Sequence, residues 1–318
     1  MSRVHLFLQS YCYRHHYLHE PGFDAFAFLD RAAADGYTGV SININGPNYR
    51  QLSGTSKDHI RQVRHRLETN KLRCDMETSG TDEAHFTTML EVCAGLGVEQ
   101  LRTYMRHAGS PRETIARTIA DLRAAAPRFK AAGVTLLLEN HEDFTGAEMA
   151  EIMRGVEGER VAALFDYGNS MMVGEQPETA LEAMLPFIRS VHLKDHACRH
   201  LDDGTVEILG VPIGSGVLPI ADLTRKLIAN GLDRIILSSV WAYRAPVRDW
   251  RGGSRWGEGV FHADAHALDP MLRPWDAPAL EKADPAHLIA LEEEAVRWGQ
   301  SWLRKTLRQI GVEVVARG

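Results

Sequence analysis

The chain has 318 residues, of which 44% are hydrophobic and 25% are charged, and its formal net charge is −6. A chain of this size can bury a full hydrophobic core, either as one large α/β domain or as two smaller ones. The acidic balance and the absence of a long basic run argue against a nucleic-acid partner, so we expect a globular protein that acts on a small molecule.

The four cysteines lie far apart in the chain and form no CxxC pair. This spacing is typical of reduced thiols rather than of a disulfide framework. The amino-terminal residues carry too short an apolar run for a signal peptide, and no window of about 18 apolar residues could span a membrane. We therefore expect a cytoplasmic protein without a membrane partner.

Short apolar runs alternate with amphipathic stretches, and the amphipathic stretches tend to end at glycine, as Gly97 and Gly133 illustrate. The strands expected in chain order begin at residues 3, 39, 72, 98, 135, 161, 190 and 234. The helices expected between and after them cover residues 23–34, 55–68, 82–96, 110–133, 146–153, 177–185, 220–229 and 285–310. Thr55 or Ser56 is the expected cap of the second helix, and Ser110, which precedes a proline, is that of the fourth.

Eight successive strand–helix units predict a closed parallel (β/α)8 TIM barrel that occupies residues 1–318 as a single domain. An open doubly wound sheet is the alternative. No GxGxxG motif follows the first strand and no P-loop is present, so neither nucleotide-binding fingerprint supports that alternative.

Polar residues follow three neighbouring strands of the predicted barrel. Glu139 and His141 end the fifth strand, Asp166 ends the sixth, and the seventh ends in His192 and Lys194. Active sites of TIM barrels lie at these carboxyl ends, so Glu139, Asp166 and His192 are candidate ligands for Mn²⁺, Mg²⁺, Co²⁺ or Zn²⁺. The alternative is that each is a structural residue with a charged neighbour.

The sequence ENH after the fifth strand, FDYGN after the sixth, VHLKD after the seventh and GSGVLPIADL from Gly214 resemble the xylose isomerase-like TIM-barrel superfamily. The resemblance covers about residues 1–242. It implies that Glu139, Asp166 and His192 bind a metal ion, and that Asn169 or Lys194 contacts the substrate. The superfamily includes sugar isomerases, ketose 3-epimerases and the endonuclease IV group.

One position departs from the epimerases that the chain resembles. Those enzymes carry a second glutamate at the end of the eighth strand, where the strand RIILSSV places Ser239. Epimerisation needs a base on each side of the carbon, whereas decarboxylation or β-elimination needs only an electron sink and one proton carrier. We assign the proton carrier to His141, with a purely orienting role as its alternative.

The resemblance implies a metal-dependent carbohydrate enzyme that forms an enediolate. The serine at the end of the eighth strand slightly favours a lyase, with a sugar isomerase or 3-epimerase as the alternative. An endonuclease IV-like nuclease or a noncatalytic binding protein is less favoured, because no basic groove or larger ligand cluster is evident. The substrate is expected to be a small carbohydrate, and an anionic one if cationic groups contact it. The candidate contacts are Lys194, His196, Arg102, Arg244 and the arginines at 248, 251 and 255.

The stretch from about residue 244 to residue 284 shows neither helical nor strand periodicity. Loops of this length are often lids or subunit contacts, so it is a candidate lid or homo-oligomer interface. Glu258 and His262 within it are candidates for a fourth metal ligand.

Overall fold

Eight parallel strands form a closed barrel in the computed structural model, which describes residues 2–240, 243–262 and 284–317. The last barrel strand pairs with both the seventh and the first, which closes the cylinder. This confirms the predicted TIM barrel. The barrel strands are β1 (Ser2–Gln9), β2 (Gly39–Asn43), β3 (Arg73–Glu77), β4 (Gln100–Thr103), β5 (Thr135–Glu139), β6 (Val161–Asp166), β7 (Ile188–Leu193) and β10 (Arg234–Leu237).

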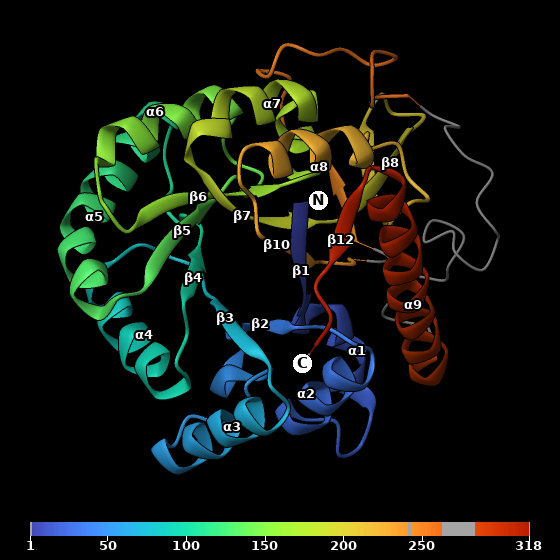
Figure 1. Ribbon diagram of the computed structural model, residues 1–318. Coiled ribbons are helices and arrows are strands. Elements are labelled where there is room, and N and C mark those ends of the chain that lie inside the picture. Colours follow the sequence, from blue (N-terminus) through green and yellow to red (C-terminus); the bar gives the residue numbers. More distant parts are fainter. Residues whose placement is uncertain (1, 241–242, 263–283, 318) are drawn as a thin grey trace.

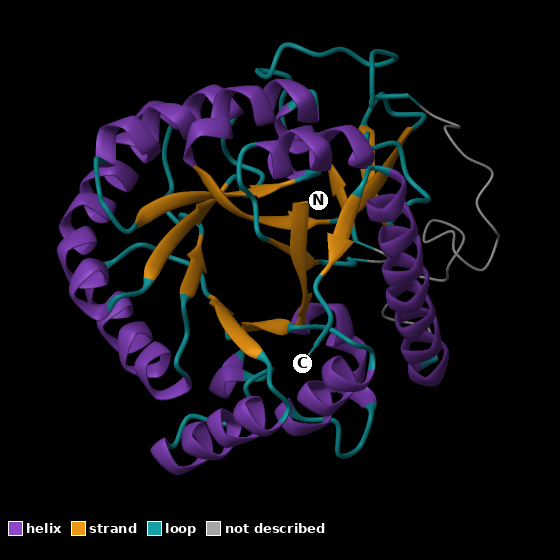
Figure 2. Cartoon of the chain, in the orientation of Figure 1, coloured by secondary structure: helices purple, strands orange, loops and turns teal. Residues whose placement is uncertain are grey.

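Helices surround the strands as an outer ring, and the last helix flanks one side of the barrel (Figure 1, Figure 2). They are α1 (Arg14–His19), α2 (Ala25–Ala34), α3 (Lys57–Thr69), α4 (Glu83–Leu96), α5 (Pro111–Ala132), α6 (Gly146–Val156), α7 (Pro177–Met184), α8 (Ile220–Ala229) and α9 (Pro285–Gln309). Short 3-10 helices cover Ser10–Tyr13, Pro47–Tyr49, Asn169–Val173 and Leu185–Phe187.

The helix boundaries follow the capping residues read from the sequence. Ser110 and Glu113 form a reciprocal capping box at the start of α5, and the side chain of Ser56 accepts a hydrogen bond from His59 N at the start of α3. Gly97 and Gly133 end α4 and α5 with φ of 70°, a conformation that glycine adopts without steric cost.

Two features of the sheets were not predicted from the sequence. Residues after β7 form an antiparallel sheet of β8 (Asp195–His200), β9 (Val206–Val211) and β11 (Arg244–Pro246), and β12 (Val312–Val314) pairs with β1. The expectation that residues 244–284 lack strand structure is therefore wrong at β11, whose pairing partners lie more than 30 residues away. Residues 263–283 of that stretch lie outside the described residues.

The barrel interior has an apolar layer followed by a polar one. Phe7, Leu137, Ala162, Leu164 and Ile236 form one buried interior cluster. Side chains on a strand alternate between its two faces, so the residues two positions further along point inward as well. Those next inward positions are polar: Gln9 after Phe7, Glu139 after Leu137, Asp166 after Leu164 and Ser238 after Ile236.

All four cysteines are buried free thiols, as the spacing of the cysteines in the sequence predicts. Among the helices of the described residues, none combines the length and the hydropathy that crossing a bilayer would require.

Candidate metal centre

Three buried side chains converge at the carboxyl ends of β5, β6 and β7. One ligand atom each from Glu139, Asp166 and His192 lies within 4.8 Å of the other two, and all three residues are buried. His192 Nδ1 lies 2.9 Å from Glu139 Oε1 and 3.9 Å from Asp166 Oδ2. The structure therefore brings together the three residues that the sequence predicts as metal ligands.

Lys194 and Asn169 surround the carboxylate of Asp166. Lys194 Nζ lies 2.8 Å from Asp166 Oδ2 and donates a hydrogen bond to Asn169 Oδ1 at 3.0 Å. Burial raises the pKa of Asp166, and the Lys194 ammonium opposes that rise. Asn169 Nδ2 lies 3.5 Å from Glu139 Oε1, so this predicted substrate contact joins Lys194 to a ligand carboxylate.

Glu77, at the end of β3, is a fourth member of the site that the sequence interpretation did not identify. Its Oε1 accepts a hydrogen bond from His192 Nε2 at 3.0 Å, and Arg102 donates to its Oε2 at 2.6 Å. Arg102 Nε also lies 3.3 Å from Glu139 Oε2. The sequence signal was available, because Glu77 ends a barrel strand as Glu139 does, but its partner is 115 residues away.

The charges of these groups depend on one another. Burial disfavours the charged form of Glu77, but the charges of Arg102 and His192 hold its pKa at about 2. Burial also lowers the pKa of His192, but the carboxylates of Glu77 and Glu139 raise it to about 9. The pKa of Glu139 lies well below its usual value, because Arg102 and His192 outweigh the effect of burial. Glu77 and Glu139 are therefore ionised at neutral pH.

A cavity of about 560 Å³ opens at this end of the barrel. Its volume lies within the usual range for small-molecule sites. Glu139, His192 and Lys194 line its inner part, together with Arg102 and His141. Tyr11 and Leu18, from the segment that follows β1, also line it and are among the exposed large hydrophobic residues.

His141 lies on the cavity wall against Tyr104, with ring centroids 3.8 Å apart and an angle of 9° between the ring planes. Burial lowers the pKa of His141 to about 4, so the imidazole is neutral at neutral pH. A neutral imidazole can accept a proton, and the role of His141 as proton carrier stays a prediction.

The cationic residues predicted as an anion clamp are mostly occupied elsewhere. Arg248 NH2 donates to Glu142 Oε2 at 2.6 Å, and Arg251 pairs with Glu148 at 3.2 Å. Arg244 is exposed in β11 and is not among the residues that line the cavity. The clamp therefore does not form around the cavity in this structure.

Other predicted residues also lie away from the cavity. His196 is completely buried in β8 against Gly168, where a Cβ atom would come within 2.4 Å of His196 Nδ1. Glu258 and His262 are exposed, and the Glu258 carboxylate accepts a hydrogen bond from the backbone of Arg255. Within the described residues, neither of them joins the ligand group as a fourth ligand.

Ser238 is the residue that the eighth barrel strand, β10, places in the site. The prediction that Ser239 takes this position is wrong. Ser238 lines the cavity and donates a hydrogen bond to Gln9 Oε1 at 2.6 Å. Ser239 does not line it, and its backbone N–H points to Cys12 Sγ at 3.1 Å. The reason is the alternation of the strand, which turns Ile236 and Ser238 to the same side. As the sequence predicts, this position carries a serine and not a carboxylate.

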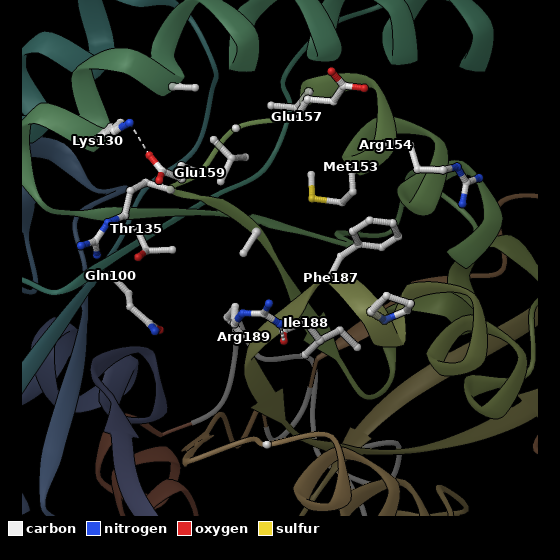
Figure 3. Close-up of a pocket in the computed structure, with 18 of the residues that line it drawn as sticks. Gln100, Lys130, Thr135, Met153, Arg154, Glu157, Glu159, Phe187, Ile188 and Arg189 are labelled. Carbon is white, nitrogen blue, oxygen red and sulfur yellow. Dashed lines mark hydrogen bonds and ion pairs between the residues drawn. The ribbon is translucent and has the colours of Figure 1, made fainter.

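A larger cavity of about 1560 Å³ lies at the opposite end of the barrel (Figure 3). Gln100, Thr135 and Ile188, which line it, come from the amino ends of β4, β5 and β7. Lys130 pairs with Glu159 at its edge, as the dashed line in Figure 3 marks. Residues at the amino ends of barrel strands contribute to stability rather than to catalysis, so we place the function in the smaller cavity.

The donor set fits a divalent cation. Two carboxylates and one imidazole are ligands that Mn²⁺, Co²⁺ and Zn²⁺ accept, and they leave positions for substrate oxygens or water. Glu139 Oε2 is buried and accepts no hydrogen bond from the described residues. Arg102 Nε lies 3.3 Å from this oxygen in an ion pair, so the oxygen already has a cationic neighbour, and it keeps acceptor capacity for a metal ion.

Comparison with known proteins agrees with this fold. The sequence model described as xylose isomerase-like TIM barrel matches residues 29–259. The uncharacterized protein YihM of Escherichia coli (strain K12) is 26% identical over 205 residues, which are 64% of this chain, and the match spans 63% of the length of that relative.

Solved structures of the same fold include a D-psicose 3-epimerase with D-tagatose from Clostridium cellulolyticum H10, at a TM-score of 0.63, 14% identity, and coverage of 94% of this chain and 99% of that one. The IOLI protein with a binding zinc atom gives a TM-score of 0.63 and 14% identity, covering 96% of this chain and 99% of that one. A 3-keto-D-glucoside 4-epimerase from E. coli gives 0.56 and 13%, covering 78% and 96%.

Proposed function

Because this chain belongs to the xylose isomerase-like TIM-barrel family and carries a buried Glu–Asp–His group, we propose that it is a metal-dependent sugar isomerase or epimerase. The observation that carries the proposal is the convergence of Glu139, Asp166 and His192 beside a cavity of suitable size for a sugar. A divalent ion held by these residues would polarise a substrate carbonyl and stabilise negative charge on the neighbouring oxygens.

Two residues of the cavity wall are candidates for accepting a proton and for binding an oxyanion. His141 is neutral above about pH 4 and faces the cavity, so it can accept a proton from a substrate carbon. Burial acts to lower the pKa of Lys194, but the charge of Asp166 outweighs burial and holds the pKa above its usual value. Lys194 is therefore cationic and can bind an oxyanion. We assign these two roles to His141 and Lys194.

The charge of the site favours an anionic substrate or intermediate. With a divalent ion and a neutral His192, the ligand group and the charged side chains paired with it would carry one net positive charge, because two cationic side chains and the ion outweigh three carboxylates. The carboxylates are Glu77, Glu139 and Asp166, and the cations are Arg102 and Lys194. A sugar acid or the enediolate of a ketose would neutralise that charge, and we propose a keto sugar or an oxo sugar acid as the substrate.

A lyase remains the second candidate because of β10. The position at which the related epimerases were expected to carry a second glutamate is Ser238, so one of the two bases of that arrangement is missing. Decarboxylation or β-elimination would need only one proton carrier. The names of the structural relatives favour isomerase or epimerase chemistry over a lyase.

The test begins with metal analysis of protein purified without chelator. We expect about one divalent ion per chain, loss of activity on chelation and recovery when Mn²⁺, Co²⁺, Mg²⁺ or Zn²⁺ is returned. A protein that cannot be loaded with any of these ions would refute the proposal.

The chemistry is then separated by incubating the loaded protein in D2O with ketoses, aldoses and oxo sugar acids. An isomerase or epimerase incorporates deuterium beside the carbonyl without loss of carbon, which NMR detects. Release of CO₂, or loss of a substituent from the sugar, would favour the lyase instead.

A further inference from the structure

The carboxylate of Glu77 is completely buried and held by side chains from several strands. Its Oε1 accepts hydrogen bonds from Ser41 Oγ at 2.6 Å and from His192 Nε2 at 3.0 Å. Its Oε2 accepts from Gln9 Nε2 and from Arg102 NH2, both at 2.6 Å. These partners lie on β1, β2, β4 and β7, so the position of the carboxylate is fixed by the barrel itself.

This environment distinguishes Glu77 from the candidate ligands. Both of its oxygens are already occupied by donors, and it is not a member of the group whose ligand atoms lie within 4.8 Å of one another. Glu139, in contrast, has an Oε2 that accepts no hydrogen bond within the described part of the chain, although Arg102 Nε lies 3.3 Å away in an ion pair. Glu77 is therefore placed to hold a neighbour and not to bind an ion.

The neighbour is His192, whose two ring nitrogens face different partners. Nδ1 faces Glu139 and Asp166, and Nε2 faces Glu77. A neutral imidazole carries one N–H donor and one acceptor nitrogen. When Nε2 donates its proton to Glu77, Nδ1 is the nitrogen that remains available to a metal ion.

We infer that Glu77 is a positioning residue of the metal centre, which fixes the tautomer and the ring orientation of His192 so that Nδ1 binds the ion. This inference rests on the proposed function, because it requires that the site binds a divalent cation. It adds a residue from β3 to a site otherwise built from β5, β6 and β7.

The alternative is that Glu77 has a purely structural role as the buried partner of Arg102. The chain offers a matched control two residues earlier in β3. Asp75 is 3% exposed and accepts hydrogen bonds from Arg234 NH1 to both of its oxygens at 3.0 Å. It is thus also a buried carboxylate paired with a buried arginine, and none of its hydrogen bonds involves His192.

The experiment compares Glu77→Gln with Asp75→Asn, using calorimetric titration of the metal-free proteins with Mn²⁺ and with Zn²⁺. We expect Glu77→Gln to weaken binding about 10–100-fold, as loss of a carboxylate behind a ligating histidine generally does. Asp75→Asn should lower stability and leave the metal affinity unchanged. An unchanged affinity in Glu77→Gln, or an equal loss in both variants, would overturn the inference.

A second measurement uses the wild-type protein, so it does not depend on whether Glu77→Gln folds. In the Zn²⁺-loaded protein with ¹⁵N-labelled histidine, the ring signals that disappear in His192→Gln should show a protonated Nε2 and a metal-bound Nδ1. Metal at Nε2 would overturn the inference while leaving the proposed function intact. Failure of the wild-type protein to bind any of Mn²⁺, Co²⁺, Mg²⁺ and Zn²⁺ would refute both.

Discussion

Lys194 Nζ lies 2.8 Å from Asp166 Oδ2, so a cationic side chain is paired with the carboxylate of a candidate metal ligand. A divalent ion bound to Asp166 would have to share this carboxylate with the ammonium group. Two like charges at such a distance repel each other strongly in a buried site. The pair therefore sets both the affinity of the site for metal and its net charge.

Replacing Lys194 by Met should tighten metal binding and impair catalysis at the same time. We expect the Kd for Mn²⁺ to fall by about tenfold, because the competing positive charge is removed. Activity on anionic substrates should fall, because the group assigned to the oxyanion is lost. Calorimetry and steady-state assays measure the two effects, and Lys130→Met at the opposite end of the barrel is the control. Weaker metal binding in Lys194→Met would show that Lys194 supports the site rather than competing with the ion.

Replacing His192 by Ala should reduce metal affinity by at least about 100-fold, because a ligand lost from a three-ligand site cannot be compensated by the remaining carboxylates. Metal content after dialysis and a competition titration measure this effect. His262→Ala changes an exposed histidine outside the ligand group and should retain the ion. An unchanged affinity in His192→Ala would remove this residue from the ligand set.

Replacing Ser238 by Glu should add a carboxylate to the polar layer of the barrel. We expect tighter Mn²⁺ binding, by about tenfold, since each added anionic ligand raises the affinity for a hard cation. Ser238→Gln has the same size without the charge, and it should leave the affinity close to that of the wild type. Equal effects of Glu and Gln would show that position 238 does not reach the ion.

Glu175 should make stability depend on pH. Burial raises its pKa to about 7, although the Gly146 N–H donates a hydrogen bond to its carboxylate at 2.8 Å. An acid whose pKa is raised on folding stabilises the folded state below its unfolded pKa, and this contribution is lost as the pH rises to about 7. Glu175→Gln should therefore be more stable than the wild type above pH 7, by about 1–3 kcal/mol, and similar to it below pH 5.

Urea denaturation at a series of pH values measures the effect of Glu175→Gln. Glu151→Gln removes an exposed carboxylate from α6 and serves as the control, which should keep the wild-type pH dependence. A difference between Glu175→Gln and the wild type that does not change between pH 5 and pH 8 would contradict the prediction.

The sequence alone was enough to predict the barrel and three residues of the candidate metal centre. Apolar runs that recur with helical segments between them define eight parallel strands, and parallel strands covered by helices close into this architecture. Glu139, Asp166 and His192 could be predicted because each lies at the end of such a run, where all strand ends meet at one face. Capping residues such as Ser110 also identified helix ends, because their hydrogen bonds are local in sequence.

The folded structure was needed to see how the strands face one another and which distant side chains meet. A shift of one residue reverses the direction of a side chain, so Ser238 and Ser239 could be told apart only by the pairing of β10 with β7 and β1. Glu77 reaches His192 across 115 residues, and no local pattern encodes such a contact. The antiparallel sheet of β8, β9 and β11 was missed for the same reason, since its pairing depends on segments that only the folded chain brings together.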